Sequence, residues 1–272
     1  MISDLMLVVG VGVLSAALRS FRQAFLFRLG TLGLVATSFL AGWLLGGSLI
    51  LGVFFAAMWF LLPWLEILTR IRRLRLPLDR RLTPSTPPTR AVFPQFSELS
   101  DEMEAAGFVF VEDTAWSHEA TRQFFRVFQN AASRTIAAIC FVEKNEFAFY
   151  YITFTSRTAD GRTFLTWNYP FSFGLRLPPA YALNRVDGEK PIPDLVTLHE
   201  TFLAAHGIAR PDLRDVPPDE VTADMQRELR AQLDHNLACG LLVKDGPEMI
   251  RYSVRGMFFL WFQFLRDFVR LS

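Results

Sequence analysis

One stretch of the chain, residues 31–68, contains no lysine or arginine and only one acidic residue, Glu66. As an α-helix rising about 1.5 Å per residue, it would be nearly twice as long as the ~30 Å hydrocarbon core of a bilayer. A single helix cannot use that length, and the Gly-Gly-Ser sequence that begins at Gly46 offers a natural break. We therefore predict two transmembrane helices, near residues 31–45 and 49–68, that form a hairpin.

Small residues follow a four-residue spacing on both predicted helices. Ser38, Gly42 and Gly46 share one face of the first helix, and Gly52 and Ala56 share one face of the second. Small side chains let helix backbones approach closely in lipid, where packing and interhelical hydrogen bonds hold helices together. The spacing predicts close helix packing, either within the hairpin or between copies of the chain.

Arginines flank the hairpin on both sides. They precede it at Arg19, Arg22 and Arg28 and follow it at Arg70, Arg72, Arg73, Arg75, Arg80 and Arg81. Positive flanks stay on the cytoplasmic side of a membrane. We therefore expect a multi-pass protein of a bacterial-type inner membrane, with both ends of the hairpin and the following domain in the cytoplasm.

A shorter apolar run, residues 5–18, comes before the hairpin. At helical rise it measures roughly 21 Å, so it either spans the membrane as a short helix, with its N-terminus outside, or lies against the hairpin. A cleaved secretory signal has positive charge before its apolar stretch. Here the preceding residues carry only Asp4, which argues against a cleaved signal.

Charge divides the chain into two parts. Up to residue 91 there are ten arginines and three acidic residues, whereas the remainder has 18 basic and 24 acidic residues. An acidic domain repels a phosphate backbone, so nucleic acid is not an expected partner. The two cysteines, Cys140 and Cys239, are far apart and lack the spacing of a metal site. We interpret them as buried thiols in a reducing compartment.

The chain divides into an anchor (1–75), a proline-rich extended linker (76–94) and a soluble α+β domain (95–272). In this domain we predict a helix that ends at Gly107, a short strand at 108–111 and an antiparallel meander. The meander consists of β-rich runs separated by turn residues, at 123–129, 135–142, 147–156 and 163–169. Its first runs carry large apolar residues on both faces, so we expect both faces of the sheet to be covered.

Two helices, at 193–206 and 218–238, and a hairpin at 241–244 and 249–254 follow. The chain then ends in an amphipathic helix at 257–271. Its polar stripe consists of Gln263, Arg266, Asp267 and Arg270, and its apolar surface includes Phe258, Trp261, Phe262 and Leu265. Such a helix needs apolar surroundings on most sides, which either the core of the domain or the membrane interface beside the anchor can provide.

Few residues suggest chemistry. His199 and His206 are seven positions apart, and the position where a zinc-protease helix needs its second histidine is Leu203. The Trp167-Asn168-Tyr169 sequence places a polar amide among aromatic side chains and could line a pocket or a partner surface. The sequence offers no cofactor motif, no metal site and no catalytic set.

The hypothesis that fits these features best is a membrane-anchored interaction or assembly module, an accessory subunit of a membrane complex. Its expected partners are the lipid bilayer and other membrane proteins. The alternative is a membrane-associated enzyme that acts on a lipid or lipid-linked substrate. A polar cavity in which His199, His206 or Asn168 converges with an acid would favour the enzyme, whereas a shallow apolar surface and dispersed histidines would favour the module.

Overall fold

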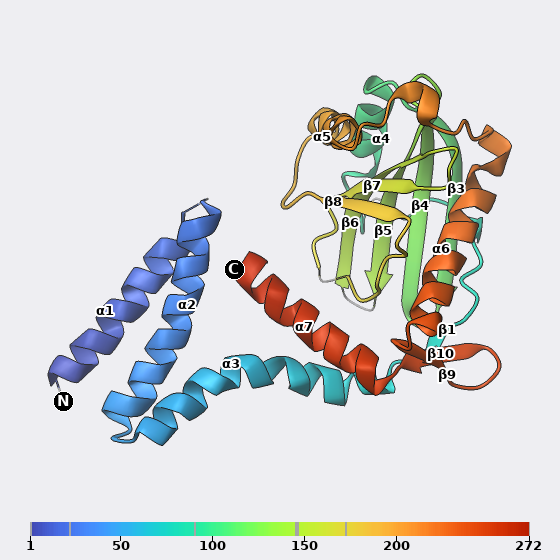
Figure 1. Ribbon diagram of the computed structural model, residues 1–272. Helices are drawn as coiled ribbons and strands as arrows, with labels where there is room; N and C mark the ends of the chain where they lie inside the picture. The colour runs from blue at the N-terminus through green and yellow to red at the C-terminus, as the bar shows by residue number, and fades with distance from the viewer. Residues whose placement is uncertain (1, 22, 90, 145–146, 172, 272) are drawn as a thin grey trace.

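The computed structural model describes residues 2–21, 23–89, 91–144, 147–171 and 173–271. It confirms the predicted fold class, because three apolar helices at the N-terminus are followed by a domain with a largely antiparallel sheet and by a C-terminal helix. Figure 1 shows the first two helices at one end of the molecule and the domain at the other. The third helix and the C-terminal helix lie between them.

Within the described part of the chain, three helices are long and apolar enough to cross a membrane. They are α1 (Ile2–Arg19), α2 (Ala24–Leu40), which continues in a π-helical turn (Ala41–Leu45), and α3 (Leu49–Thr69). The break after Gly46 lies where we predicted it. Two boundaries differ from the prediction: α2 begins before residue 31 and includes Arg28, and α1 is a full helix that packs along α2.

The main sheet has the strand order β2-β3-β4-β5-β6-β7-β8, and every neighbouring pair is antiparallel except β7 with β8. The strands are β2 (Thr83–Pro84), β3 (Val109–His118), β4 (Thr121–Asn130), β5 (Thr135–Lys144), β6 (Phe147–Arg157), β7 (Thr163–Trp167) and β8 (Tyr181–Arg185). The predicted meander corresponds to β4 to β7 and is confirmed. β3 is longer than predicted, and β8 was not predicted.

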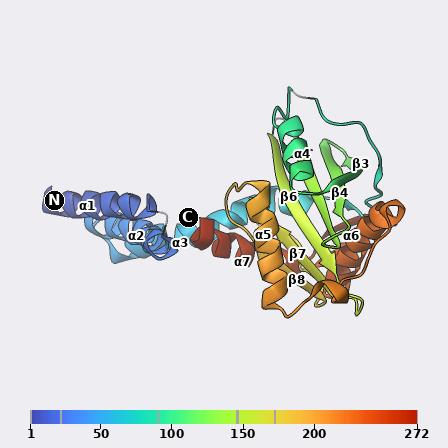
Figure 2. The same cartoon turned by 90° about the horizontal axis from the view of Figure 1, so that it is seen from above.

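Helices cover both faces of this sheet (Figure 2). The helices α4 (Phe96–Ala105) and α5 (Ile192–Ala205) pack on one face and enclose a core rich in phenylalanine. Helix α6 (Val221–Ala238) packs on the other face and encloses a second core. Short 3-10 turns at Arg210–Asp212 and Pro218–Glu220 lead from α5 to α6.

The proline-rich segment 76–94 is extended, but it is attached to the domain along its length. Leu76–Pro77 forms β1 and pairs with β10, while Thr83–Pro84 forms β2 at the edge of the main sheet. Proline is tolerated there because an edge strand does not need every backbone donor. Leu82 and Phe93 are buried in the two cores of the domain. The segment therefore fixes the domain close to the anchor instead of separating the two as a spacer.

A second, three-stranded sheet has the order β1-β10-β9, with β9 (Leu242–Lys244) and β10 (Met249–Tyr252). It confirms the predicted final hairpin and leads into α7 (Val254–Leu271). After the 3-10 turn Ile71–Arg73, the chain passes from α3 directly into this sheet. The small sheet thus lies where the anchor meets the domain.

Candidate functional site

His199 lies on the side of α5 that faces the sheet and is 2% exposed. Its Nε2 is 3.0 Å from Ser156 Oγ, and its Nδ1 is 2.9 Å from Thr166 Oγ1. Burial lowers the pKa of the imidazole to about 4, because the charged form would lose its hydration. His199 is therefore a neutral core histidine with both ring nitrogens hydrogen-bonded.

Ser156 and His199 have the spacing of a nucleophile and its base. A working pair also needs substrate access and a group that orients the histidine, commonly a carboxylate. The group at the other ring nitrogen is the Thr166 hydroxyl, and Ser156 is 1% exposed. Ser156 Oγ also lies 3.0 Å from Thr135 Oγ1. These hydrogen bonds connect β5, β6, β7 and α5 in the core of the domain.

His206 is exposed at the end of α5. Its Nδ1 is 2.8 Å from the carbonyl oxygen of Phe202, and its ring packs edge-on against Phe202 and Phe164. It contributes nothing to the hydrogen bonds around His199. The structure thus places the two histidines in separate environments, one buried and one on the surface.

Asn168 follows directly after β7 and bonds to the neighbouring strand. Its Oδ1 accepts a hydrogen bond from the backbone N–H of Ile152 at 2.6 Å, so the amide continues the ladder with β6. The rings of Trp167 and Tyr169 lie 6.0 Å apart, and Tyr169 also meets Tyr151 edge-on at 4.9 Å. Trp167 and Tyr169 thus form an aromatic edge of the sheet, and the amide of Asn168 between them has a structural role in pairing with β6.

The sheet separates the histidine from this aromatic edge. Successive side chains of a strand point to opposite faces, so Thr166 faces α5 and bonds to His199, whereas Trp167 faces α6. His199 and the aromatic edge around Trp167 therefore lie on opposite faces of the sheet.

A buried charge network connects the end of β6 to α6. Arg157 is within 2.6 Å of both Asp224 and Glu228, and Arg214 and Arg227 also contact Asp224. Burial pushes the pKa of the Asp224 carboxyl upward, but the arginines outweigh it and the pKa is lowered. At Glu228 burial prevails and the pKa is raised. Sequence analysis did not identify this network, because its members are 57 or more positions from Arg157 in the chain.

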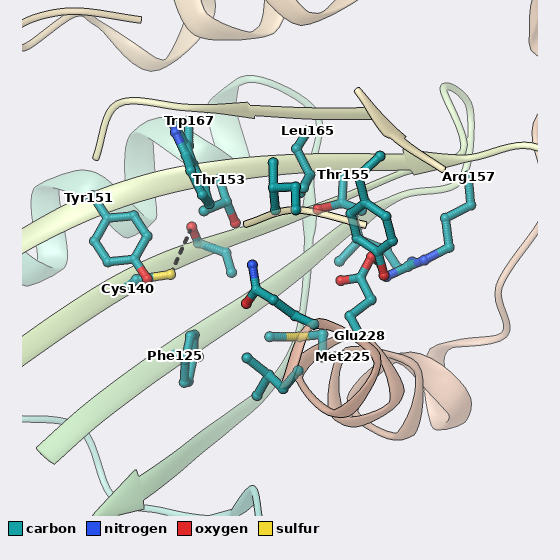
Figure 3. Close-up of a pocket in the computed structure, with 16 residues that line it drawn as sticks. Phe125, Cys140, Tyr151, Thr153, Thr155, Arg157, Leu165, Trp167, Met225 and Glu228 are labelled. Carbon is teal, nitrogen blue, oxygen red and sulfur yellow. Dashed lines mark hydrogen bonds and ion pairs between the residues drawn. The ribbon is translucent and has the colours of Figure 1, made fainter. Parts of the chain in front are cut away.

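A hollow of about 120 Å³ lies between the sheet and α6; we call it the α6 hollow (Figure 3). β5 contributes Ala138 and Cys140, and β6 contributes Thr153 and Thr155. The ion pair of Arg157 and Glu228 lies at one end, and the rings of Tyr151 and Trp167 lie at the other. The burial of Cys140 raises the pKa of its thiol to about 12, so the thiol is not a nucleophile.

The C-terminal helix packs on the anchor. Trp261 donates a hydrogen bond from Nε1 to the carbonyl oxygen of Phe60 at 2.8 Å, one turn before Pro63 in α3. The ring of Trp64 contacts the rings of Phe258 and Trp261, with centroids 4.9 and 6.2 Å apart. Helix α7 thus lies against α3 of the anchor.

Anchor and domain share a core at this point, which we call the junction. Its buried residues are Ile67 from α3, Leu233 from α6, Leu242, Ile250 and Tyr252 from the small sheet, Leu260 from α7 and Leu175. Ile67, Leu233 and Ile250 are at most 1% exposed. The central side chains of the junction are thus as fully buried as those in the interior of a domain.

One residue of the polar stripe of α7, Asp267, contacts the domain. Asp267 is 2% exposed and lies 3.3 Å from Arg185 at the end of β8. Phe258 and Phe262 are more than half exposed, while Leu265 is partly buried. The helix therefore has a polar contact with the sheet edge, an apolar contact with α3 and exposed aromatic side chains.

Within the anchor, the glycines mark helix crossings. A Cβ at Gly42 would lie 2.5 Å from the carbonyl oxygen of Leu51, and one at Gly52 would lie 2.8 Å from that of Phe39. Ser38 accepts a hydrogen bond from Trp59 at 2.9 Å. Gly46 lies at the turn between the helices, and Ala56 is partly buried. These contacts lie within one chain and join α2 to α3.

No three potential metal-ligating side chains of histidine, cysteine, aspartate or glutamate come together among the residues that the structure describes. No protein-family model, curated protein or solved structure matches this chain.

Proposed function

We propose that this protein is a membrane-anchored interaction or assembly module, an accessory subunit of a membrane complex. Its domain would lie at the cytoplasmic face of a bacterial-type inner membrane. The observation that carries the proposal is the junction, where α3, α7, α6 and the small sheet share one buried core. This core would hold the domain at a fixed height and orientation above the bilayer, as the assembly of several subunits requires.

Two connections to the anchor support this fixed placement. The chain enters the domain from α3, and α7 returns from the domain to α3. The indole of Trp261 donates a hydrogen bond to the carbonyl oxygen of Phe60, one turn before Pro63. The missing N–H of Pro63 leaves the carbonyl of Trp59 in the same turn without its usual helical donor. A tether alone would need only the first connection. The second connection restrains the domain in rotation as well as in distance.

The dispersed polar residues also favour a module over an enzyme. His199 is enclosed in the core, His206 lies on the surface and Asn168 completes a strand pair. Neither histidine lines a cavity with a carboxylate. Asn168 lines a depression together with Glu189, but its Oδ1 accepts a hydrogen bond from the backbone of Ile152, and no hydrogen bond among the described residues joins it to that carboxylate. These residues therefore do not form the kind of catalytic group that a reaction on a lipid-linked substrate would need.

Contact with lipid is proposed for two surfaces near the junction. Phe258 and Phe262 on α7 continue the exposed apolar surface of α3. Exposed Phe147 lines a depression that also includes Arg70 and Arg73 at the end of α3. Aromatic and basic side chains are the residues that anchor proteins at the headgroup level of a membrane.

The proposal is tested by extracting the protein with its surrounding lipid and identifying the co-purifying proteins by mass spectrometry. We expect the same membrane proteins at constant stoichiometry, also when one of those proteins is used as bait. Leu260→Ala, which opens the junction, lowers this recovery, whereas Phe262→Ala on the exposed side of the same helix leaves it unchanged. Recovery of the protein alone, as a monomer, would contradict the proposal.

Orientation is tested separately with reporter fusions at the C-terminus and at Gly47 in the loop between α2 and α3. We expect cytoplasmic activity from the C-terminal fusion and periplasmic activity from the loop fusion. A periplasmic C-terminus would overturn the proposed placement of the domain.

A further inference from the structure

The α6 hollow arises from an asymmetry in two central strands. On the side facing α4 and α5, β5 and β6 carry large residues, namely Ile139, Phe141, Ile152 and Phe154. On the side facing α6, the same strands carry Ala138, Cys140, Thr153 and Thr155. The first face is filled by packed rings. The second face leaves a space that the side chains of Met225 and Leu229 from α6 do not fill.

The size of the hollow limits what it can hold. Its volume is about 120 Å³. An apolar protein cavity of roughly 150 Å³ binds benzene. The aromatic side chains of Phe125, Tyr151 and Trp167 are part of the lining. The hollow is smaller than this cavity, so it can hold at most one small ring and is too small for a lipid with long acyl chains.

Polar groups in the lining of the hollow lack partners. The indole Nε1 of Trp167 is buried and has no hydrogen-bond partner among the described residues. The side chain of Thr155 is buried at 7% exposure, it borders the hollow, and its hydroxyl makes no hydrogen bond to any residue that the structure describes. Ser156, the next residue in β6, has its hydroxyl bonded on the opposite face of the sheet. Buried hydroxyls are normally hydrogen-bonded. The Thr155 hydroxyl is thus available to a bound molecule.

The charged end of the hollow favours a neutral ligand. Arg157 is already matched by Asp224 and Glu228 at 2.6 Å, and the two further arginines of the network contact Asp224 from its exposed side. A ligand carboxylate would have to compete with Glu228 for Arg157 while losing its own hydration. A hydroxyl loses much less hydration and hydrogen-bonds equally well to Thr155.

We propose that the α6 hollow is a binding site for a small, neutral molecule consisting of one aromatic ring and one hydroxyl group. The ring lies among Phe125, Tyr151 and Trp167, and the hydroxyl bonds to Thr155. This site lies on the face of the sheet opposite His199 and does not depend on the proposed assembly role of the protein.

The test uses the full-length protein in detergent-free lipid nanodiscs, with p-cresol and toluene as probes of the same ring size. Saturable binding is followed by ligand-observed NMR, and protein stability by thermal unfolding. We expect p-cresol to bind about 5-fold more tightly than toluene, since one net hydrogen bond distinguishes them. Thr155→Val removes this difference, whereas the matched variant Thr201→Val, on the exposed side of α5, keeps it.

A cavity-filling variant separates binding in the hollow from partition into lipid. Ala138→Leu fills the hollow from β5 and abolishes saturable binding of both probes; if this variant does not fold, Leu229→Phe fills the hollow from α6. Binding that survives in the filled protein would place the probes elsewhere and overturn the proposal. So would the lack of saturable binding to the unmodified protein at millimolar probe concentrations, or equal affinity for p-cresol and toluene.

Discussion

His199 shows how a residue that suggests chemistry can serve structure instead. Its two ring nitrogens bond to hydroxyls from two different strands, Ser156 on β6 and Thr166 on β7. These contacts attach α5 to the sheet, and the burial of the ring requires it to be uncharged. The same requirement makes the stability of the domain depend on pH.

We predict that the free energy of unfolding falls as the pH decreases from about 6.5 towards 4. In this window the unfolded chain protonates His199, whereas the folded chain, with its pKa lowered to about 4, does not. The loss amounts to about 3 kcal/mol at most. Urea unfolding at a series of pH values measures it. His199→Gln flattens the curve in this window, while His206→Gln retains it; superimposable curves for His199→Gln and the unmodified protein would contradict the assignment.

Asp224 is predicted to be the most sensitive member of the charge network. Asp224→Asn leaves Arg157 buried at 8% exposure with only Glu228 as a counter-charge, and we expect a loss of about 3 kcal/mol in unfolding free energy. Asp234→Asn removes an exposed ion pair on the same helix and has little effect. Chemical denaturation compares the two variants. Equal stabilities would show that the network does not hold α6 to the sheet.

At the scale of elements, α1 and α2 are joined by a contact that sequence analysis overlooked. A Cβ at Gly30 would lie 2.6 Å from the backbone oxygen of Ser15, so only glycine permits this approach. The predicted hairpin consisted of the second and third helices, and Gly30 lies outside the four-residue spacing of small residues that predicted their packing. The first two helices form a hairpin at least as closely packed.

Gly30→Ala is therefore predicted to separate α1 from α2 and to lower the thermal stability of the anchor, by about 1–3 kcal/mol for an overpacked contact. Gly10→Ala in α1 is the matched control. Its Cβ meets nothing within 4 Å, and alanine favours a helix, so it leaves stability unchanged or slightly raised. Thermal unfolding in nanodiscs, followed by an α1–α2 cysteine cross-link, measures both. Identical behaviour of the two variants would refute the close crossing.

Local patterns predicted most elements, because the signals for them are contained in a few neighbouring residues. The meander, the final hairpin and the C-terminal helix belong to this class. β8 does not belong to it. This strand follows a long irregular segment and pairs in parallel with β7, and no turn sequence beside it indicates that pairing. The α6 hollow had a readable signal in the alternation of small and large residues along β5 and β6. Interpreting that signal required knowing which helix covers each face.

At the scale of the whole molecule, the junction determines how the domain is attached to the anchor. The proline-rich segment suggested a spacer, and a spacer would leave the domain free to move. Instead β1 joins the small sheet, and Leu260 and Ile67 pack into one core with it. Proline-rich composition limits the conformation of a segment, but it does not show whether the segment is free or bound. That depends on partners far away in the sequence.

The central claim is that the junction holds the domain in one position relative to α3. Pulsed electron–electron double resonance tests it in nanodiscs with spin labels at Leu62 on α3 and Thr201 on α5, after replacement of Cys140 and Cys239 by alanine. A label pair at Asp234 and Thr201, both within the domain, supplies the distance distribution of a rigid pair. We predict that the distribution between Leu62 and Thr201 is equally narrow. A distribution several times broader would show a domain that moves freely on its anchor and would contradict the account.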